Sequence, residues 1–218
     1  MSEIQATHDD SATEETLFYH EAALNATWTG SRLLIGSLSF LFGAFVFAYF
    51  YLRSLNSHGL WRPAGFISPH VWAGTVIMAL VVLSAAVQTV ALRTLKRGGK
   101  AAWQRAAIGA LVLGLAAVGM QIWELLNLPF FPGQGGFASV FVGFYPVYAV
   151  IALGAMIWLE TLVVRATKLP TAWFTAPPGA TDDVIVLQHF QAALSAFTAV
   201  WNYLAAIAIL AWILFYLV

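Results

Sequence analysis

The chain has 218 residues, of which 61% are hydrophobic and 9% are charged, and its formal net charge is zero. Soluble domains carry roughly a quarter charged residues, so this composition excludes an ordinary soluble protein and indicates a polytopic membrane protein. The sequence has no cysteine, which excludes disulfides, thiolate metal sites and nucleophilic thiols.

The N-terminal segment, residues 1–30, is polar and acidic. It carries six acidic residues and neither Lys nor Arg, which is the opposite of a secretory signal peptide. We expect a solvated tail that ends in a short surface helix, followed by one membrane domain over residues 31–218.

Five apolar segments reach the length of about 20 residues that a helix needs to cross a bilayer. They predict an all-α bundle of five transmembrane helices, with spans at about 33–52, 71–92, 106–123, 138–164 and 190–218. The segments between them contain the Gly and Pro clusters that are typical of loops.

The Lys and Arg residues predict the orientation of the bundle. One side holds eight of them (Arg32, Arg93, Lys96, Arg97, Lys100, Arg105, Arg165 and Lys168) and the other side holds only Arg53 and Arg62. Basic loops stay in the cytoplasm, so we expect a cytoplasmic N-terminus, an outer C-terminus and a multi-pass protein of the inner (plasma) membrane.

The first span carries a stripe of small residues, among them Gly36, Ser39 and Gly43. Small residues let helix backbones approach closely in lipid, so we expect this stripe to pack against protein. The partner is either another helix of this chain or a larger subunit beside it.

Two acids fall inside the apolar segments, where an ionisable group is costly. Glu124 ends the third span, with Gln121 one turn before it, and we expect this pair to form a polar contact between helices. Glu160 lies near the basic end of the fourth span, where it reaches water or pairs with a base such as Arg165. Neither acid makes a catalytic site by itself.

The second loop is basic, with Arg93, Lys96, Arg97 and Lys100. A short basic loop between spans is the ordinary signature of a cytoplasmic side, and its charges are expected to contact lipid headgroups. We therefore predict membrane phospholipids and not nucleic acid as the partner of this loop.

The five histidines lie outside the middle of every apolar run: His8, His20, His58, His70 and His189. Haem and copper sites at bilayer depth use imidazole ligands, so the chain is expected to bind no metal or cofactor and to have no catalytic centre of its own. Six of the nine Trp (Trp28, Trp61, Trp72, Trp103, Trp123 and Trp201) fall near segment ends, which predicts aromatic belts at the membrane interfaces.

Several segments, in order, resemble one family. Leu33 to Arg53, most closely its end Ala48-Tyr-Phe-Tyr-Leu-Arg53, resembles the signature of subunit III of haem-copper oxidases. Further similar segments are Ala91 to Gly98, Gln121 to Glu124, Ser139 to Phe144, Trp201 and Phe215 to Leu217. The resemblance covers roughly residues 30–218, and the number of spans fits the five-span members of the family.

The sequence departs from the family at most of its polar positions. Leu38 stands where the family has a buried acid, and Gly143 to Tyr148 and Trp201 to Ala205 lack its histidines and aspartate. In the family these groups line a lipid-holding cleft near the side of proton uptake. The scaffold role depends on helix faces instead, and of the polar anchors Gln121 and Glu124 remain.

The resemblance therefore implies an accessory, non-redox subunit of a respiratory terminal oxidase of the cytochrome c oxidase type. Its expected partners are the catalytic subunit I and subunit II, which carry the haem and copper. An accessory subunit of a quinol oxidase, a nitric oxide reductase or another respiratory complex is the alternative within this class. A small transporter or channel is the alternative of another class, although the spans are largely unbroken and almost free of charge.

Overall fold

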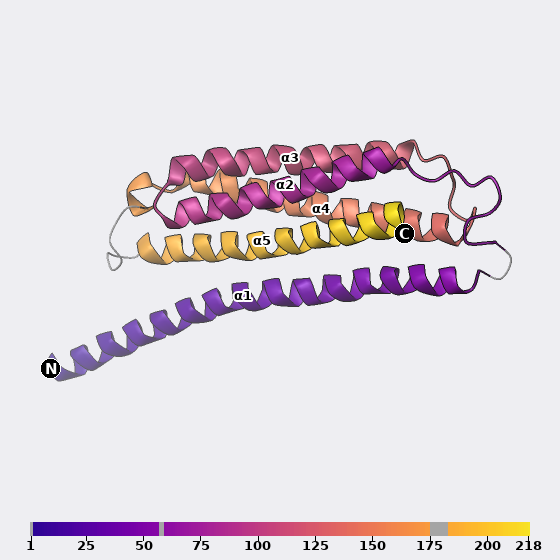
Figure 1. Ribbon diagram of the computed structural model, residues 1–218. Helices are drawn as coiled ribbons and strands as arrows, with labels where there is room; N and C mark the ends of the chain where they lie inside the picture. Colours follow the sequence, from indigo (N-terminus) through magenta and orange to yellow (C-terminus); the bar gives the residue numbers. More distant parts are fainter. Residues whose placement is uncertain (1, 57–58, 175–182) are drawn as a thin grey trace.

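The protein is an all-α bundle of five long helices in a computed structural model (Figure 1). The structure describes the backbone of residues 2–56, 59–174 and 183–218, and the side chains of 18–56, 59–174 and 185–218. Its elements are α1 (Ser2–Ser54), α2 (Val71–Lys96), α3 (Lys100–Leu126), α4 (Gly136–Lys168), the short 3-10 helix η1 (Thr171–Phe174), α5 (Asp183–Trp212) and the π-helical turn η2 (Ile213–Leu217).

All five α-helices are long and apolar enough to cross a membrane, in α1 from Phe18 onward. At 1.5 Å rise per residue, even the 26 residues of α2 exceed the roughly 30 Å hydrocarbon core of a bilayer. The chain is thus a multi-pass membrane protein, and the predicted all-α class with five spans is confirmed.

Helix α1 differs from the expected tail with a short surface helix, because one continuous helix of 53 residues begins at Ser2. Residues 2–29 contain no Pro and no Gly, so nothing in this stretch breaks a helix once the apolar part has formed. In Figure 1 the N-terminal part of α1 extends beyond the rest of the bundle.

The helices pack in a definite order. Helices α2 and α3 are joined by a tight turn at Gly98, which has a positive φ of 86°. Helix α5 contacts α1, α2 and α4, and α1 lies along α5 and α4 on one side of the bundle (Figure 1).

The end that holds the C-terminus is closed by aromatic side chains. Trp61 and Phe66 from the loop after α1, and Phe130 from the loop after α3, contact Phe137 of α4. Two backbone bonds, from Gly136 N to Leu60 O and from Phe137 N to Trp61 O, fix the first of these loops to the start of α4. We call this region the aromatic end.

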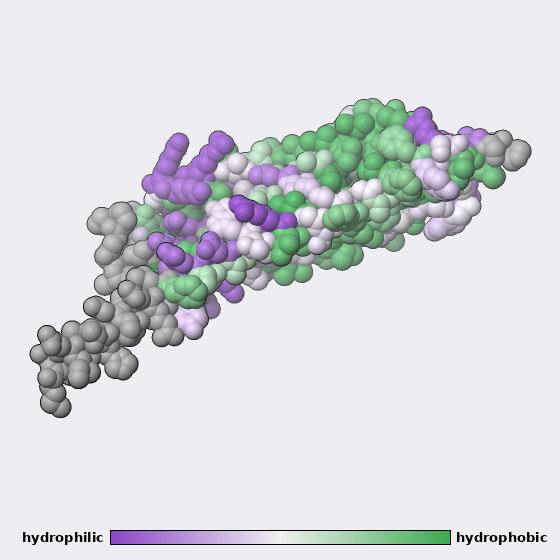
Figure 2. All heavy atoms as spheres, turned by 90° about the horizontal axis from the view of Figure 1, so that it is seen from below, coloured by the Kyte–Doolittle hydropathy of each residue, from purple (hydrophilic) through white to green (hydrophobic). Residues whose placement is uncertain are grey.

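The opposite end carries the exposed basic side chains of the second and fourth loops, and we call it the basic end. Most of the hydrophilic surface in Figure 2 gathers near this end, while hydrophobic residues cover the remaining length of the bundle.

Three of the tryptophans predicted as belt residues are core residues instead. Trp103 and Trp201 are fully buried and Trp61 is nearly so, whereas Trp28, Trp72 and Trp123 are exposed as an interfacial belt requires. The indole N–H of Trp201 donates to the hydroxyl of Ser84 in α2 at 3.1 Å. Proximity to a segment end did not distinguish these two roles.

Candidate functional site

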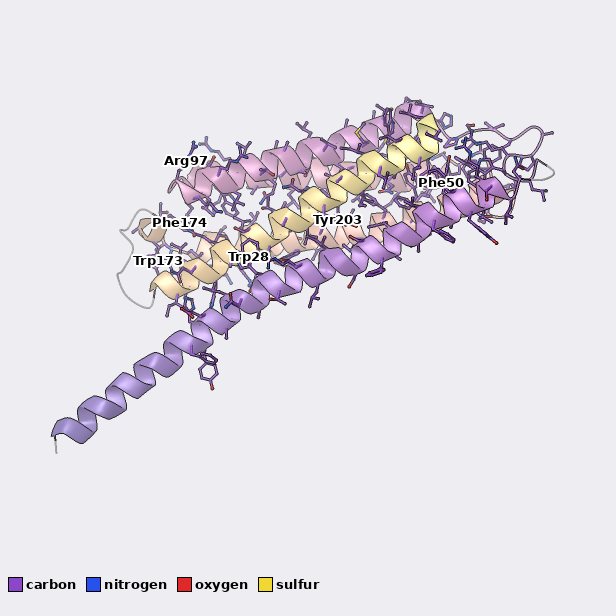
Figure 3. The ribbon with its side chains drawn as sticks, turned by 60° about the horizontal axis from the view of Figure 1, so that its bottom comes forward. Trp28, Phe50, Arg97, Trp173, Phe174 and Tyr203 are labelled. Carbon is purple, nitrogen blue, oxygen red and sulfur yellow. The ribbon has the colours of Figure 1, made fainter. Side chains whose placement is uncertain are left out.

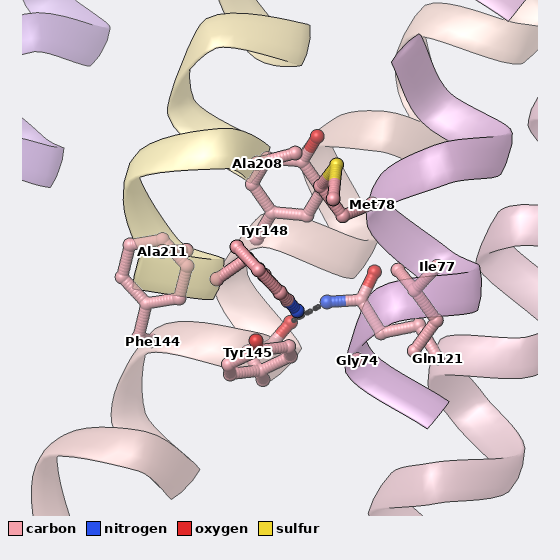
Figure 4. Close-up of a pocket in the computed structure, with 10 residues that line it drawn as sticks. Gly74, Ile77, Met78, Gln121, Phe144, Tyr145, Tyr148, Ala208 and Ala211 are labelled. Atoms are coloured by element: carbon pink, nitrogen blue, oxygen red, sulfur yellow. Dashed lines mark hydrogen bonds between the residues drawn. The ribbon is translucent and has the colours of Figure 1, made fainter. Parts of the chain in front are cut away.

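Gln121 connects α3 to α4. Its side chain is buried, and its Nε2 donates to the carbonyl oxygen of Tyr145 at 3.1 Å, just before Pro146 (Figure 4). The acceptor is backbone, so this contact fixes the two helices in register regardless of the side chain at position 145. The predicted contact residue thus touches a helix of its own chain.

Glu124 lies one turn further along α3 and connects to the end of α5. Its Oε1 accepts a hydrogen bond of 2.7 Å from the hydroxyl of Tyr216, while its buried Oε2 has no hydrogen-bond partner among the described residues. Tyr216 belongs to the π-helical turn η2. The side chains of residues 213–217 are therefore rotated about the helix axis relative to the positions they would take if the α-helix continued. This turn therefore sets the position of the hydroxyl that meets Glu124.

Two glycines that no sequence pattern marks provide close helix contacts. A Cβ added at Gly74 of α2 would overlap the ring of Tyr216, and one added at Gly114 of α3 would overlap the sulfur of Met156 in α4. Gly74 therefore makes room for the tyrosine that bonds Glu124. The sequence could not separate these two positions, because 17 glycines are spread along the chain.

The space between these helices is small. A cavity of about 10 Å³ is lined by Gly74, Gln121, Tyr145 and Tyr148 together with apolar residues of α2, α4 and α5. That volume suits at most one water molecule. The hydroxyl of Tyr148 is bonded to the carbonyl oxygen of Leu204 at 3.0 Å, so this polar cluster is built for contact between helices.

The stripe on the first span divides into two parts. Ser39 donates to the hydroxyl of Tyr203 in α5 at 3.0 Å, and Figure 3 shows Tyr203 between the two helices. At Gly36 and Gly43, by contrast, an added Cβ would meet nothing within 4 Å. These two glycines face away from the other described helices of the chain.

The four basic residues predicted to contact lipid headgroups fall into two groups, exposed and buried. Arg93, Lys96 and Arg97 are exposed at the basic end, as headgroup contact requires. Lys100 is only 7% exposed, its ammonium donates to the carbonyl oxygen of Leu169, and it lies 5.7 Å from the ring centroid of Phe174. Lys100 is therefore turned inward, where it ties the start of α3 to the end of α4.

The second acid, Glu160, lies on an exposed face of α4. Within the described part of the chain it forms no ion pair with Arg165. The two residues are five positions apart, which places them on different faces of a helix with 3.6 residues per turn.

Two histidines that lie 169 residues apart in the chain meet at the basic end. His20 of α1 and His189 of α5 approach to 3.1 Å between Nδ1 and Nε2, and Nε2 of His20 lies 2.7 Å from Oε1 of Gln188. No third His, Cys, Asp or Glu joins them in a group that could hold a metal, among the residues described. The pair connects α1 to α5.

Comparisons with known proteins do not identify a family for this chain. No protein-family model matches the chain. No characterised protein matches it either.

Proposed function

We propose that this chain is an accessory, non-redox subunit of a respiratory haem-copper terminal oxidase, similar to subunit III of the cytochrome c oxidase type. In this role it packs beside the catalytic subunit I and subunit II, which carry the haem and copper, and stabilises them in the inner membrane. The proposal rests on the resemblance over residues 30–218 and on one geometric observation.

That observation is the outward face of α1. Gly36 and Gly43 lie within Leu33 to Arg53, the segment that resembles the family signature, yet neither packs against another described helix of the chain. Between and beside them Phe40 and Phe47 are exposed by 85% and 69%. Small residues between large apolar ones form a surface against which a second helix can pack closely. This face is therefore suited to contact a partner subunit.

The interior argues against a transporter or channel. Such a protein needs a polar path with room for its substrate between its helices. Here the cavity lined by Gln121, Tyr145 and Tyr148 has about 10 Å³, and the Gln121 amide and the Tyr148 hydroxyl are already bonded to backbone carbonyls. An accessory subunit of a quinol oxidase or nitric oxide reductase remains the alternative within the same class.

Co-purification tests the proposal. The full chain, tagged and extracted in mild detergent, is expected to carry haem absorption bands that disappear when it is separated from its partners. Gly36→Leu and Gly43→Leu together should abolish the co-purified haem without lowering the thermal stability of the isolated chain. Gly119→Leu is the matched control, because an added Cβ at Gly119, as at Gly36 and Gly43, would meet nothing within 4 Å. Retention of the partners by the double variant would contradict this interface.

Topology is tested separately. The excess of Lys and Arg at the basic end supports a cytoplasmic N-terminus and an outer C-terminus. A periplasmic reporter fused after Val218 should be active, and the same reporter inserted between Lys96 and Lys100 should be silent. The reverse pattern would overturn the proposed orientation.

A further inference from the structure

A second cavity lies at the basic end, between the last turn of α4 and the first turns of α5. Its volume is about 360 Å³, within the range of small-molecule sites. Arg165, Lys168 and His189 line it together with apolar residues that include Leu162, Phe190 and Ala193.

No acid among the described side chains neutralises the two cations of this cavity. Arg165 and Lys168 are three residues apart on one face of α4 and exposed, and neither side chain has a hydrogen bond or ion pair among the side chains that the structure describes. Glu160, the acid nearest to them on α4, is not part of the lining. Two like charges that line one cavity repel each other, and a bound anion would remove this repulsion.

The histidine adds a polar group to this cavity. His189 is half-buried and uses its Nε2 in the contact with His20. Its Nδ1 has no partner within the described residues. Lys100 differs from Arg165 and Lys168, because its ammonium already contacts the carbonyl oxygen of Leu169 and the ring of Phe174. The charges around this cavity are therefore available to a ligand.

The floor of the cavity is apolar and continues along the bundle. Leu162 and Phe190 are 2% and 7% exposed. Further along the same face of α4 lie Trp158, half-buried against Phe197, and Gly154, where an added Cβ would meet nothing within 4 Å. Cations at the basic end, with an apolar surface further along α4, match a molecule with an anionic head and a hydrocarbon tail.

We infer that this cavity binds one anionic phospholipid, with its phosphate at Arg165, Lys168 and His189 and an acyl chain along the face of α4 that carries Trp158 and Gly154. The site is distinct from the basic loop between α2 and α3. The inference does not depend on the oxidase assignment, because it requires only the bundle and a membrane.

Native mass spectrometry of the full chain, purified in mild detergent and titrated with dioleoylphosphatidylglycerol or dioleoylphosphatidylcholine, tests the site. We expect one molecule of the anionic lipid to bind more tightly than the zwitterionic one. Arg165→Gln with Lys168→Gln should weaken binding of the anionic lipid by about 25-fold, since each basic group near a lipid surface contributes roughly fivefold.

The matched control removes the same charge from the same end. Arg32→Gln with Arg105→Gln changes two exposed residues outside the cavity and should alter binding by less than about twofold. Equal losses in both double variants would show that the general charge of this end attracts the lipid, and would overturn the site. Unchanged binding in the Arg165 and Lys168 variant would overturn it as well.

Two further measurements distinguish a bound lipid from a bound free phosphate. Ala193→Phe fills the apolar floor and keeps the charges, so it should weaken lipid binding by about tenfold or more through steric exclusion. Glycerol 3-phosphate carries the same phosphate chemistry without acyl chains and should not displace the lipid at equal concentration. Displacement by glycerol 3-phosphate, or full lipid binding by Ala193→Phe, would contradict the lipid as occupant.

Discussion

The two ends of the bundle are built from different chemistry. At the aromatic end, Tyr49, Trp61, Phe137 and Phe215 pack edge to face with centroids 4.9–5.9 Å apart, and the loops are bonded to helix ends. At the basic end, α1 and α5 meet through polar side chains, and a cavity of about 360 Å³ separates parts of α4 and α5.

This difference separates stability from binding. Aromatic pairs contribute about 0.5–1.5 kcal/mol each beyond the area they bury, and the cavity in the loops of the aromatic end, about 180 Å³, has no charged residue in its lining. Among the described residues, the basic end has fewer such pairs, and its cations Arg165 and Lys168 form no ion pair there. We therefore expect the largest effects on unfolding from changes near the aromatic end, and effects on ligand binding from changes at the basic end.

The largest expected effect is that of Gly74→Ala. The added methyl would overlap the ring of Tyr216, so either the ring or α2 must shift, and overpacking of this kind costs up to about 3 kcal/mol. Thermal or denaturant unfolding of the purified chain in detergent measures it.

Gly119→Ala is the control for this change, because it adds the same methyl to an exposed helix position with nothing within 4 Å. It should leave stability unchanged or raise it slightly, since alanine favours helix over glycine. A loss no larger at Gly74 than at Gly119 would refute the close contact with Tyr216.

The second largest effect is expected at Glu124. Glu124→Leu removes the acceptor of the Tyr216 hydroxyl and should cost about 1.5 kcal/mol, while Glu124→Gln keeps an acceptor and should cost about 0.6 kcal/mol or less. A double-mutant cycle with Tyr216→Phe measures the coupling between the two side chains.

An assembled complex adds a second readout for Glu124. Under the proposed function, Glu124→Gln should leave turnover intact. Loss of turnover with normal assembly and haem content would place Glu124 on a proton or substrate route and would contradict its structural role.

The fold class and the five spans followed from the sequence because length and apolarity are nearly sufficient to define a transmembrane helix. Helix ends were harder: α3 begins at Lys100 and not near residue 106, because polar residues continue a helix once the apolar part has nucleated it. The length of α1 was missed for the same reason.

The contacts of the candidate site were only partly predictable. Gln121 and Glu124 stood out as polar groups in an apolar helix, but their acceptor and donor, Tyr145 and Tyr216, are 24 and 92 residues away. The backbone carbonyl of Tyr145 and the side chain of a tyrosine such as Tyr216 carry no signal in the sequence that marks them as partners. Spacing along one helix likewise cannot show whether a glycine faces a neighbour, as Gly74 does, or the outside, as Gly43 does.

A smaller effect is expected at the basic end from Lys100→Met. The change keeps the length of the side chain but removes the bond to the Leu169 carbonyl and the cation near Phe174, which should cost about 1 kcal/mol. Lys96→Met is the control, since Lys96 is exposed. The free energy of unfolding of this variant should equal that of the original chain. Equal effects at the two positions would show that Lys100 acts only through its charge.

The smallest effect is expected from His20→Ala. Loss of the contacts with His189 and Gln188 frees the start of the membrane part of α1 from α5, yet the aromatic packing of Tyr49 with Trp61 and Phe215 still holds the far end of α1. We expect a loss of about 0.5 kcal/mol in global stability but a clear rise in amide hydrogen exchange over residues 18–30, because opening at this end does not require the rest of the bundle to unfold. His70→Ala, at the exposed residue before α2, is the control and should leave exchange in residues 18–30 unchanged. If His20→Ala instead lowered global stability as much as Gly74→Ala does, the two ends of the bundle would unfold as one unit, and the separation between a stabilising end and a binding end would be wrong.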